Sequence, residues 1–457
     1  MTRSPASPRP VPVRRYRYSK WRWRVLVRLL DGAGAVAMRL WRQVRPIPPL
    51  GTPRRILLVQ LDHLGDAVLS SPMLPQLRTA FPEARIDVLA SPSNREVFEA
   101  DPHVDQVHLA ERNWFERRPG GWALGSAVWT LGRSLRNAGY DLGIDVRGDV
   151  LTVLVLALAR IPRRLGWAMG GGGFLLTDVA PWVSGRHEVH ARLALLETLG
   201  MAADGPARVV VHTTDRDRIR VGRWLREAWP SREAKGTTVP ARARTPSRAY
   251  FAHSSTQSEP HLESRPSTKA HLASSDWPTG GWLGVSAPLL AVHLGAGTAA
   301  KRWPPRHWAE LVGRFLADGW RVVVVGGPED LDASAALTPH PNLVDWTGRL
   351  KLTETAALLE RADLFIGADS GPAHLAACAG LPSVVLFSGT NLRRQWRPWS
   401  RRSLVLRHRV SCQPCHHKAC PLADHPCMAG LHPDRVYRAA RRWWTRTQRA
   451  ELAHGGA

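Results

Sequence analysis

The sequence predicts an α/β protein with parallel sheets in two domains. Residues 363–390 contain a short apolar run, a tight turn, an Ala-rich helix and a second apolar run, which is the order of a parallel β-α-β unit. Two more apolar runs, residues 290–294 and 321–325, also end in turns of small residues. A length of 457 residues suits two domains, each with enough chain to bury its own core.

Residues 1–54 form a basic N-terminal extension. Its first part is rich in Arg and Pro and is expected to be unstructured. Residues 21–43 combine Trp, Val and Leu with five arginines and one Asp, so they suit neither a membrane span nor a signal peptide. Two alternatives are open: an amphipathic helix on anionic lipid, or a helix packed on the body of the protein. Gly32 and Gly34 weaken any long helix here.

The first domain is predicted to cover residues 55–215. A strand at residues 55–59 leads into a turn at residues 61–66, which lacks the Gly-x-Gly-x-x-Gly pattern, so this half is not expected to hold the nucleotide. A carboxylate on the turn, Asp66, can act as a general base on a hydroxyl group. The alternative is that Asp66 caps the following helix. Further strands are predicted at residues 84–89, 106–109 and 142–146, and helices at residues 120–137, 149–159 and 189–199.

Three other features of this domain lead to expectations. Arg147 and Gly148 follow a strand at the carboxyl edge of the sheet, where they could meet the phosphates of an acceptor. The four glycines at residues 170–173 predict a mobile loop. An exposed helix start is the simplest account of the polar residues that open the last helix, which are His187, Glu188 and His190.

A linker is predicted at residues 216–288. Ser, Thr, Arg, Pro and Ala dominate most of it, with hardly an apolar run. Such a composition cannot bury enough apolar surface to fold, so a disordered insert is expected between the domains.

The second domain, residues 289–432, is predicted to carry a nucleotide site. Three of its strands end in small-residue turns, and in a parallel sheet these turns share one edge. In the first turn, glycines at residues 295–297 let the backbone approach an anion, and Thr298 and Lys301 add a hydroxyl group and a positive charge. This turn is not a P-loop, because GxxxxGK[ST] is absent. The second turn is residues 326–330.

The third turn opens a helix. Ser370 and Gly371 would offer free backbone N–H groups to a phosphate, and Pro372 suits the first helical turn. Asp369 and His374 lie beside this turn and would hold a sugar or a phosphate. The alternative is that Asp369 only caps the helix and His374 is a surface histidine.

Four of the five cysteines fall within residues 412–427. A tetrahedral zinc site, a disulfide pair and free thiols are all open for this group, which consists of Cys412, Cys415, Cys420 and Cys427. The fifth cysteine, Cys378, is expected in the core. A basic helix is predicted for residues 433–457.

These motifs resemble glycosyltransferase family 9, the family of the ADP-heptose–lipopolysaccharide heptosyltransferases. The resemblance covers most of residues 55–215 and 288–440 and is carried by RILLVQLDHLGDAVLSS, GAGTAAKRWP, VVGGPED and IGADSGPAHLAACAGLPSVVLFSGT. It implies a GT-B fold, with two Rossmann-like domains whose parallel sheets face each other across a cleft and whose C-terminal domain holds the donor. Chains of this fold often end in a helix that crosses back to the first domain. The N-terminal extension and the insert depart from the family.

The resemblance implies an inverting glycosyltransferase (EC 2.4 class) that needs no cofactor and no catalytic metal. It would move a heptose, or a related sugar, from ADP-heptose to a lipopolysaccharide core or a similar anionic glycan. Asp66 would be the general base and Glu329 would bind the ribose. The expected donor-binding residues are Thr298, Lys301, Glu329, Lys351, Asp369, Ser370, Gly371 and His374, and the expected acceptor-binding residues are Asp62, His63 and Arg147.

The formal net charge of +25 suits a phosphorylated glycolipid or an anionic membrane surface, and the sequence has no nucleic-acid-binding motif. The expected location is the cytoplasm, with peripheral contact to anionic lipid of the inner membrane left open. Two alternatives remain: an enzyme of the same fold with another nucleotide sugar, and a non-catalytic relative that binds glycan or membrane.

Overall fold

The structure, a computed structural model, describes residues 21–110, 121–201, 207–230 and 287–454. The predictions for the first 20 residues and for nearly all of the insert lie outside the described residues.

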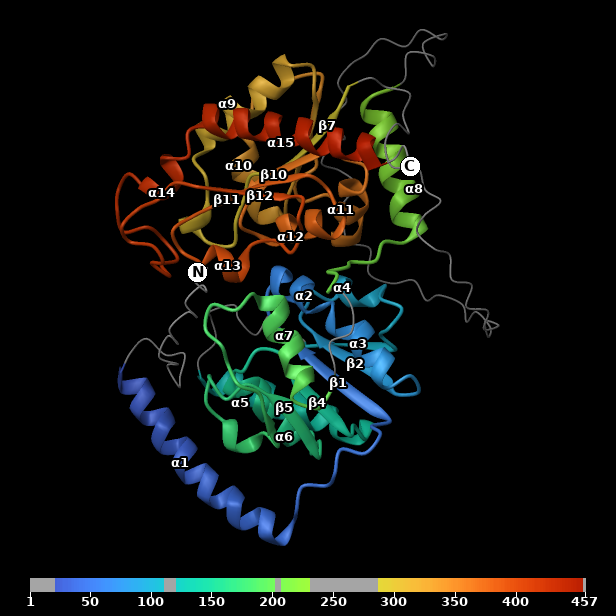
Figure 1. Cartoon of the computed structure of the whole chain (residues 1–457), viewed down its shortest axis with the longest axis vertical. Helices are drawn as coiled ribbons and strands as arrows, with labels where there is room; N and C mark the ends of the chain where they lie inside the picture. The colour runs from blue at the N-terminus through green and yellow to red at the C-terminus, as the bar shows by residue number, and fades with distance from the viewer. Residues whose placement is uncertain (1–20, 111–120, 202–206, 231–286, 455–457) are drawn as a thin grey trace, which may run out of the picture.

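Two six-stranded parallel sheets organise the chain (Figure 1). The first has the order β3-β2-β1-β4-β5-β6 and the second the order β12-β11-β10-β7-β8-β9. Both orders are the doubly wound Rossmann order, so the predicted α/β class with two Rossmann-like domains is confirmed. The strands of the first sheet are β1 (Arg55–Gln60), β2 (Arg85–Ala90), β3 (Gln106–Leu109), β4 (Leu142–Asp145), β5 (Arg163–Gly166) and β6 (Asp178–Val179). Those of the second are β7 (Leu289–His293), β8 (Arg321–Val325), β9 (Leu343–Asp345), β10 (Leu364–Ala368), β11 (Ser383–Phe387) and β12 (Ser403–Arg407).

Helices cover both faces of the first sheet. Alternate residues of β1 divide between two cores: Ile56 and Leu58 face one side, Leu57 and Val59 the other. The helices on the first side are α2 (Leu64–Ser70), α3 (Met73–Ala80), α4 (Glu96–Glu99) and α7 (Glu188–Glu197). Those on the second side are α5 (Gly121–Ser134) and α6 (Val150–Leu158). Between strands lie the short 3-10 helices η1 (Arg136–Ala138) and η2 (Gly173–Leu175).

The second sheet is covered in the same way. On one face lie α9 (Pro305–Ala317) and α15 (Pro433–His454). On the other lie α11 (Leu352–Leu359) and α12 (Gly371–Cys378), with α8 (Asp215–Ala228) packed on α11. The remaining short elements are η5 (Ala299–Lys301), η6 (Pro328–Asp330), α10 (Leu331–Ser334), α13 (Arg393–Trp396) and α14 (Pro426–Ala429).

The chain passes to the second domain after α7, and α8 packs there on α11. Helix α8 occupies the start of the stretch predicted as a linker, and a capping box between Thr214 and Asp217 begins it. Arg220 Nη1 lies 2.7 Å from Glu354 Oε1 at the buried start of α11. The expectation that the last helix crosses back is wrong: α15 packs on α9 within the second domain.

The run of four glycines is not a mobile loop, because α1 (Trp21–Val44) packs on it. Val27 lies against Gly171, where a Cβ would come within 2.8 Å of Val27 Cγ1. The backbone N–H of Gly172 donates to Asp31 Oδ1 over 2.8 Å. Glycine thus lets a helix approach this backbone closely. Among the described residues, no helix is long and apolar enough to cross a membrane.

Candidate functional site

The candidate site lies where the strand order of each sheet reverses. In the first sheet this switch point falls between β1 and β4, and in the second between β7 and β10. Ligands of doubly wound sheets bind at the carboxyl ends of the strands there. The turns that follow these four strands carry most of the predicted site residues, and Figure 1 shows α2 and α7 of the first domain facing α12 and α13 of the second.

The starts of α2 and α12 are in direct contact. A Cβ at Gly371 would lie 2.6 Å from Leu64 Cδ2, and a Cβ at Gly65 would lie 3.0 Å from His374 Cδ2. A side chain at either position would crowd its neighbour, Leu64 or His374, so glycine helps the two helices to approach this closely. This contact sets the turn with Asp66 beside the turn with Ser370.

Asp66 is the third residue of α2, whose N-cap is His63, so Asp66 is not the N-cap residue. Its Oδ1 lies 3.0 Å from Nη2 of Arg192, a side chain that is only 2% exposed. Arg192 also donates to Ser70 Oγ over 2.6 Å and forms an ion pair with Glu188. An arginine held at three points fixes the orientation of the Asp66 carboxylate.

Glu188 continues this network into the second domain. Its Oε1 accepts a hydrogen bond of 2.7 Å from Gln395 Nε2, and the neighbouring His187 Nε2 lies 2.9 Å from the carbonyl oxygen of Arg397. The expectation of an exposed helix start is therefore wrong for His187 and Glu188, which are buried, and holds only for His190. They are buried because the second domain packs over the start of α7.

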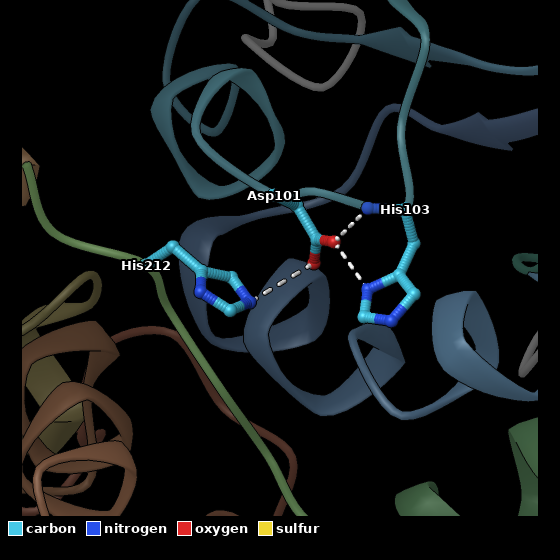
Figure 2. Close-up of side chains that lie close together, drawn as sticks. All are labelled: Asp101, His103 and His212. Atoms are coloured by element: carbon cyan, nitrogen blue, oxygen red, sulfur yellow. Dashed lines mark hydrogen bonds and ion pairs between the residues drawn. The ribbon is translucent and has the colours of Figure 1, made fainter. Parts of the chain in front are cut away.

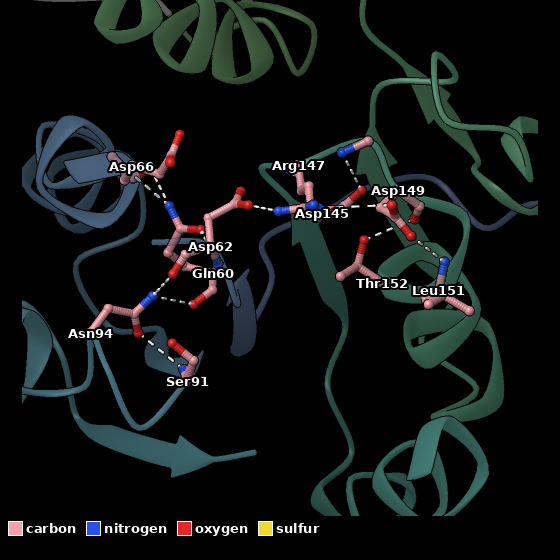
Figure 3. A network of polar contacts seen from close by, with 12 residues as sticks. Gln60, Asp62, Asp66, Ser91, Asn94, Asp145, Arg147, Asp149, Leu151 and Thr152 are labelled. Carbon is pink, nitrogen blue, oxygen red and sulfur yellow. Dashed lines mark hydrogen bonds and ion pairs between the residues drawn. The ribbon is translucent and has the colours of Figure 1, made fainter. Parts of the chain in front are cut away.

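Of the three residues expected to bind the acceptor, two lie in contact and the third does not join them. Arg147 Nη1 forms an ion pair with Asp62 Oδ1 across the β1–β4 switch point (Figure 3), whereas His63 is exposed. The backbone N–H groups of Arg147 and Gly148 donate to Asp145 over 3.2 and 2.9 Å. Burial raises the pKa of Asp145 to about 7. Because Asp62 offsets the charge of Arg147, an acceptor phosphate would have to compete with that carboxylate.

On the donor side, Lys301 and Asp369 form an ion pair. The Nζ of Lys301 lies 2.8 Å from Asp369 Oδ2, which also accepts a hydrogen bond of 3.1 Å from Asn391 Nδ2. The N-cap of α12 is Ser370, so the alternative that Asp369 only caps this helix is wrong. Both charged side chains are mostly buried, which places a cation at the N-terminus of α12.

Two buried polar atoms beside this pair lack partners within the described residues. They are Nδ1 of His374 and Oγ1 of Thr298. Burial lowers the pKa of His374 to about 4, so its ring is neutral near pH 7, and at 4% exposure it is not a surface histidine. Buried polar atoms in native proteins nearly always have a partner, so two such atoms here favour a ligand that supplies one.

A hydrogen-bonded relay that the sequence did not reveal supports the start of α12. Ser370 Oγ lies 3.0 Å from His293 Nδ1, and His293 Nε2 lies 3.0 Å from Asp330 Oδ2. Burial alone would raise the pKa of Asp330, but its hydrogen bond and ion pair with His293 lower it below the ordinary value. A Cβ at Gly295 would lie 1.7 Å from Asp330 Oδ1, so this glycine accommodates Asp330 and not a ligand.

Glu329 and Lys351 lie at the margin. Both side chains are exposed, and Lys351 is the N-cap residue of α11. The first N–H of that helix, from Leu352, donates to Glu96 Oε2 of the first domain over 2.9 Å. A protein carboxylate therefore already occupies this helix start.

The cysteine-rich segment supports the donor turns. The carbonyl oxygen of Lys418 accepts the N–H of Ala300 over 2.9 Å, and the N–H of Cys415 donates to the carbonyl oxygen of Gly389 over 2.9 Å. None of the five cysteines forms a disulfide bond in the structure. Within the described ranges, no three of the four clustered sulfur atoms lie within 4.8 Å of one another. One other group of potential metal ligands does meet this distance.

The one group of potential metal ligands among the described residues consists of Asp101, His103 and His212 (Figure 2). Asp101 Oδ1 lies 2.8 Å from His103 Nδ1, and Asp101 Oδ2 lies 3.8 Å from His212 Nε2. Two imidazoles and a carboxylate are suitable ligands for a divalent cation. Their mutual contacts already account for the arrangement, which ties the turn before β3 to the segment that leads into α8.

The chain is similar to a known family of glycosyltransferases. The family model for glycosyltransferase family 9 (heptosyltransferase) matches residues 206–425. The chain is 22% identical over 350 residues to lipopolysaccharide heptosyltransferase 3 of Escherichia coli K12, covering 74% of this chain and 84% of that protein. It is 26% identical over 370 residues to lipopolysaccharide heptosyltransferase 2 of Salmonella typhimurium, covering 77% and 88%.

A solved structure shares the fold. The E. coli ADP-heptose lipopolysaccharide heptosyltransferase II superposes with a TM-score of 0.61 at 21% identity, covering 86% of this chain and 99% of that one. The predicted GT-B fold is thereby confirmed.

Proposed function

Because the chain belongs to glycosyltransferase family 9 and is therefore a glycosyltransferase, we propose that it transfers a heptose from ADP-heptose to a lipopolysaccharide core or a similar anionic glycan. The reaction proceeds with inversion at the anomeric carbon and requires no metal. It takes place in the cytoplasm, where the acceptor glycolipid is reached at the inner membrane.

The observation that carries this proposal is the contact between the starts of α2 and α12. It sets Asp66, a carboxylate oriented by Arg192, against the wall that carries Lys301 and the free N–H groups of α12. A base on one wall and a cation on the other are what a transfer between two bound substrates needs.

In the proposed reaction, a hydroxyl oxygen of the acceptor attacks the anomeric carbon of the heptose. The bond from this carbon to the β-phosphate oxygen breaks, and its electron pair leaves with ADP. The proton of the acceptor hydroxyl passes to a carboxylate oxygen of Asp66. One attack from the face opposite the leaving group inverts the configuration.

The charge that develops on the leaving diphosphate is stabilised by the protein. Lys301 supplies a cation, and the N–H groups at Ser370 and Gly371 point out of the start of α12. Fixed donors and a fixed cation stabilise a developing anion without reorganisation, which removes the need for a metal. Thr298 Oγ1 and His374 Nδ1, both buried without a partner among the described residues, bind the phosphates or the sugar.

The remaining donor contacts lie on the exposed margin. Glu329 binds the ribose. Residues 349–352, which include Lys351, run alongside the nucleotide base. Asp62, His63 and Arg147 contact the acceptor from the first domain. Because α2 and α12 touch, the two domains must separate to admit the donor and close again for transfer.

Nucleotide selectivity tests the proposal. The thermal stability of the purified protein is measured with ADP, UDP, GDP, CDP and TDP and with their sugar conjugates. A ligand at about a hundred times its Kd stabilises the folded state by roughly 2.7 kcal/mol, so a selective rise in Tm is expected with ADP and ADP-heptose. A selective rise in Tm with another nucleotide would show that the donor carries that nucleotide and not ADP. Stabilisation by none would favour the non-catalytic alternative.

A further inference from the structure

The helix α1 has one face docked on the first domain. Val27, Asp31 and Gly34 recur at spacings of four and three residues, so they share a face. Val27 packs on Gly171, Asp31 accepts the N–H of Gly172, and a Cβ at Gly34 would lie 2.6 Å from the ring of Phe174. At the end of the helix, Arg42 Nη2 donates to the carbonyl oxygen of Leu176 over 2.7 Å.

The opposite face of α1 is apolar and exposed. Leu29, Val36 and Leu40 lie about half a turn from the docked residues and are 67%, 63% and 60% exposed. Trp21 and Val44, at the two ends of the helix, are 66% and 80% exposed. A stripe of large apolar side chains along a whole helix is unusual on a protein surface and marks a site of interaction.

Positive charge borders this stripe. Arg22, Arg28 and Arg39 are exposed on α1, and Arg45 is exposed just beyond its end. The one acidic residue of the helix, Asp31, lies on the docked face, where it is bonded to the backbone. The exposed side of α1 therefore combines an apolar strip with arginines and carries no acidic residue of this helix.

We propose that this face of α1 binds an anionic lipid surface. The apolar side chains enter the boundary between headgroups and acyl chains, and the arginines contact lipid phosphates. The two interpretations of this stretch, packed helix and interfacial helix, then apply together: one face fixes α1 to the protein and the other fixes the protein to the lipid.

A second copy of the chain fits this face less well. Two copies joined through the stripe would bring Arg28 and Arg39 of each helix towards those of the other, with no acidic side chain on the exposed face to offset them. Like charges at an interface oppose association, whereas anionic headgroups complement them.

The consequence for the enzyme rests on the proposed function. The helix is docked on the first domain, which is proposed to bind the acceptor (Figure 1). Holding that domain at the surface from which a glycolipid projects raises the local concentration of acceptor near Asp66. The lipid binding itself does not depend on catalysis.

The test is flotation of the purified full chain with vesicles, without donor or acceptor. Vesicles of phosphatidylethanolamine with phosphatidylglycerol are compared with vesicles of phosphatidylcholine alone. Leu29→Glu should lower the partition coefficient for the anionic vesicles by about tenfold or more, because it places a charge in the apolar stripe. Ile219→Glu on α8 is the matched control, since Ile219 is also an aliphatic helix residue, 68% exposed, and it should bind as the wild type does.

Three results would overturn the proposal: no preference for anionic vesicles, equal binding by Leu29→Glu and wild type, or a dimer in solution that Leu29→Glu dissolves while neither protein binds vesicles. A circular dichroism spectrum and a Tm equal to those of the wild type show that the variant is folded. Transfer to a water-soluble acceptor fragment should be unchanged in Leu29→Glu. Failure of vesicle binding is thus separable from failure of the proposed transfer.

Discussion

Asp66→Asn should lower kcat by about 10²–10⁴-fold, the usual contribution of a general base, while the Kd for the donor stays nearly unchanged. The amide keeps the size of the side chain and can still contact Arg192, but it cannot take the proton of the acceptor hydroxyl. The measurements are initial rates of ADP release with saturating substrates and donor binding by calorimetry.

The control for Asp66→Asn is Asp215→Asn, which removes a carboxylate from the exposed start of α8. It should leave both kcat and the donor Kd as in the wild type. Arg192 retains Glu188 and Ser70 in the Asp66 variant, so its Tm is expected to fall only slightly. If Asp66→Asn transfers the sugar at the wild-type rate, Asp66 is not the general base.

Lys301→Met should weaken donor binding and also lower kcat, by about 10²–10³-fold. The ammonium is the cation in the proposed diphosphate site, so its loss affects both the bound donor and the leaving group. Removing it also leaves the Asp369 carboxylate, only 4% exposed, without its ion pair and close to the phosphates. The measurements are donor Kd and single-turnover rates.

Lys301→Arg separates charge from shape, since it keeps a cation of different geometry and should recover part of the lost affinity. Lys301→Met combined with Asp369→Asn reports how much of the loss comes from the unpaired carboxylate. A donor Kd in Lys301→Met equal to that of the wild type would place the diphosphate elsewhere.

Most of the fold could be predicted because its central strands are short apolar runs that end in turns of small residues. The strands β8 and β3 lie at the predicted residues, and β1, β2, β4 and β7 differ from the prediction by at most one residue at each end. The strands that escaped prediction, such as β6 and β9, are short and half exposed at the sheet edges, where no continuous apolar run is required. The helix α8 was not predicted, because its many arginines outnumber the apolar residues Val221 and Leu225 that it buries.

The candidate site was partly predictable for a different reason. Turns that follow parallel strands share an edge, so the neighbourhood of Lys301 and Asp369 follows from strand assignments alone. Arg192 lies 126 residues from its partner Asp66, and no local pattern reveals such a pairing. The one available signal was a charged residue within the apolar run of α7. The relay through His293 was hidden because that histidine completes a buried strand.

An assay of heptose transfer shows whether the protein has the proposed activity. Purified protein is incubated with ADP-heptose and a lipopolysaccharide core acceptor that lacks the heptose, with and without EDTA, and the glycolipid is analysed by mass spectrometry and by NMR of the new anomeric centre. The expected result is a gain of one heptose with inverted configuration, at the same rate in EDTA. An acceptor that remains unmodified while ADP-heptose binds, or a product with retained configuration, would contradict it.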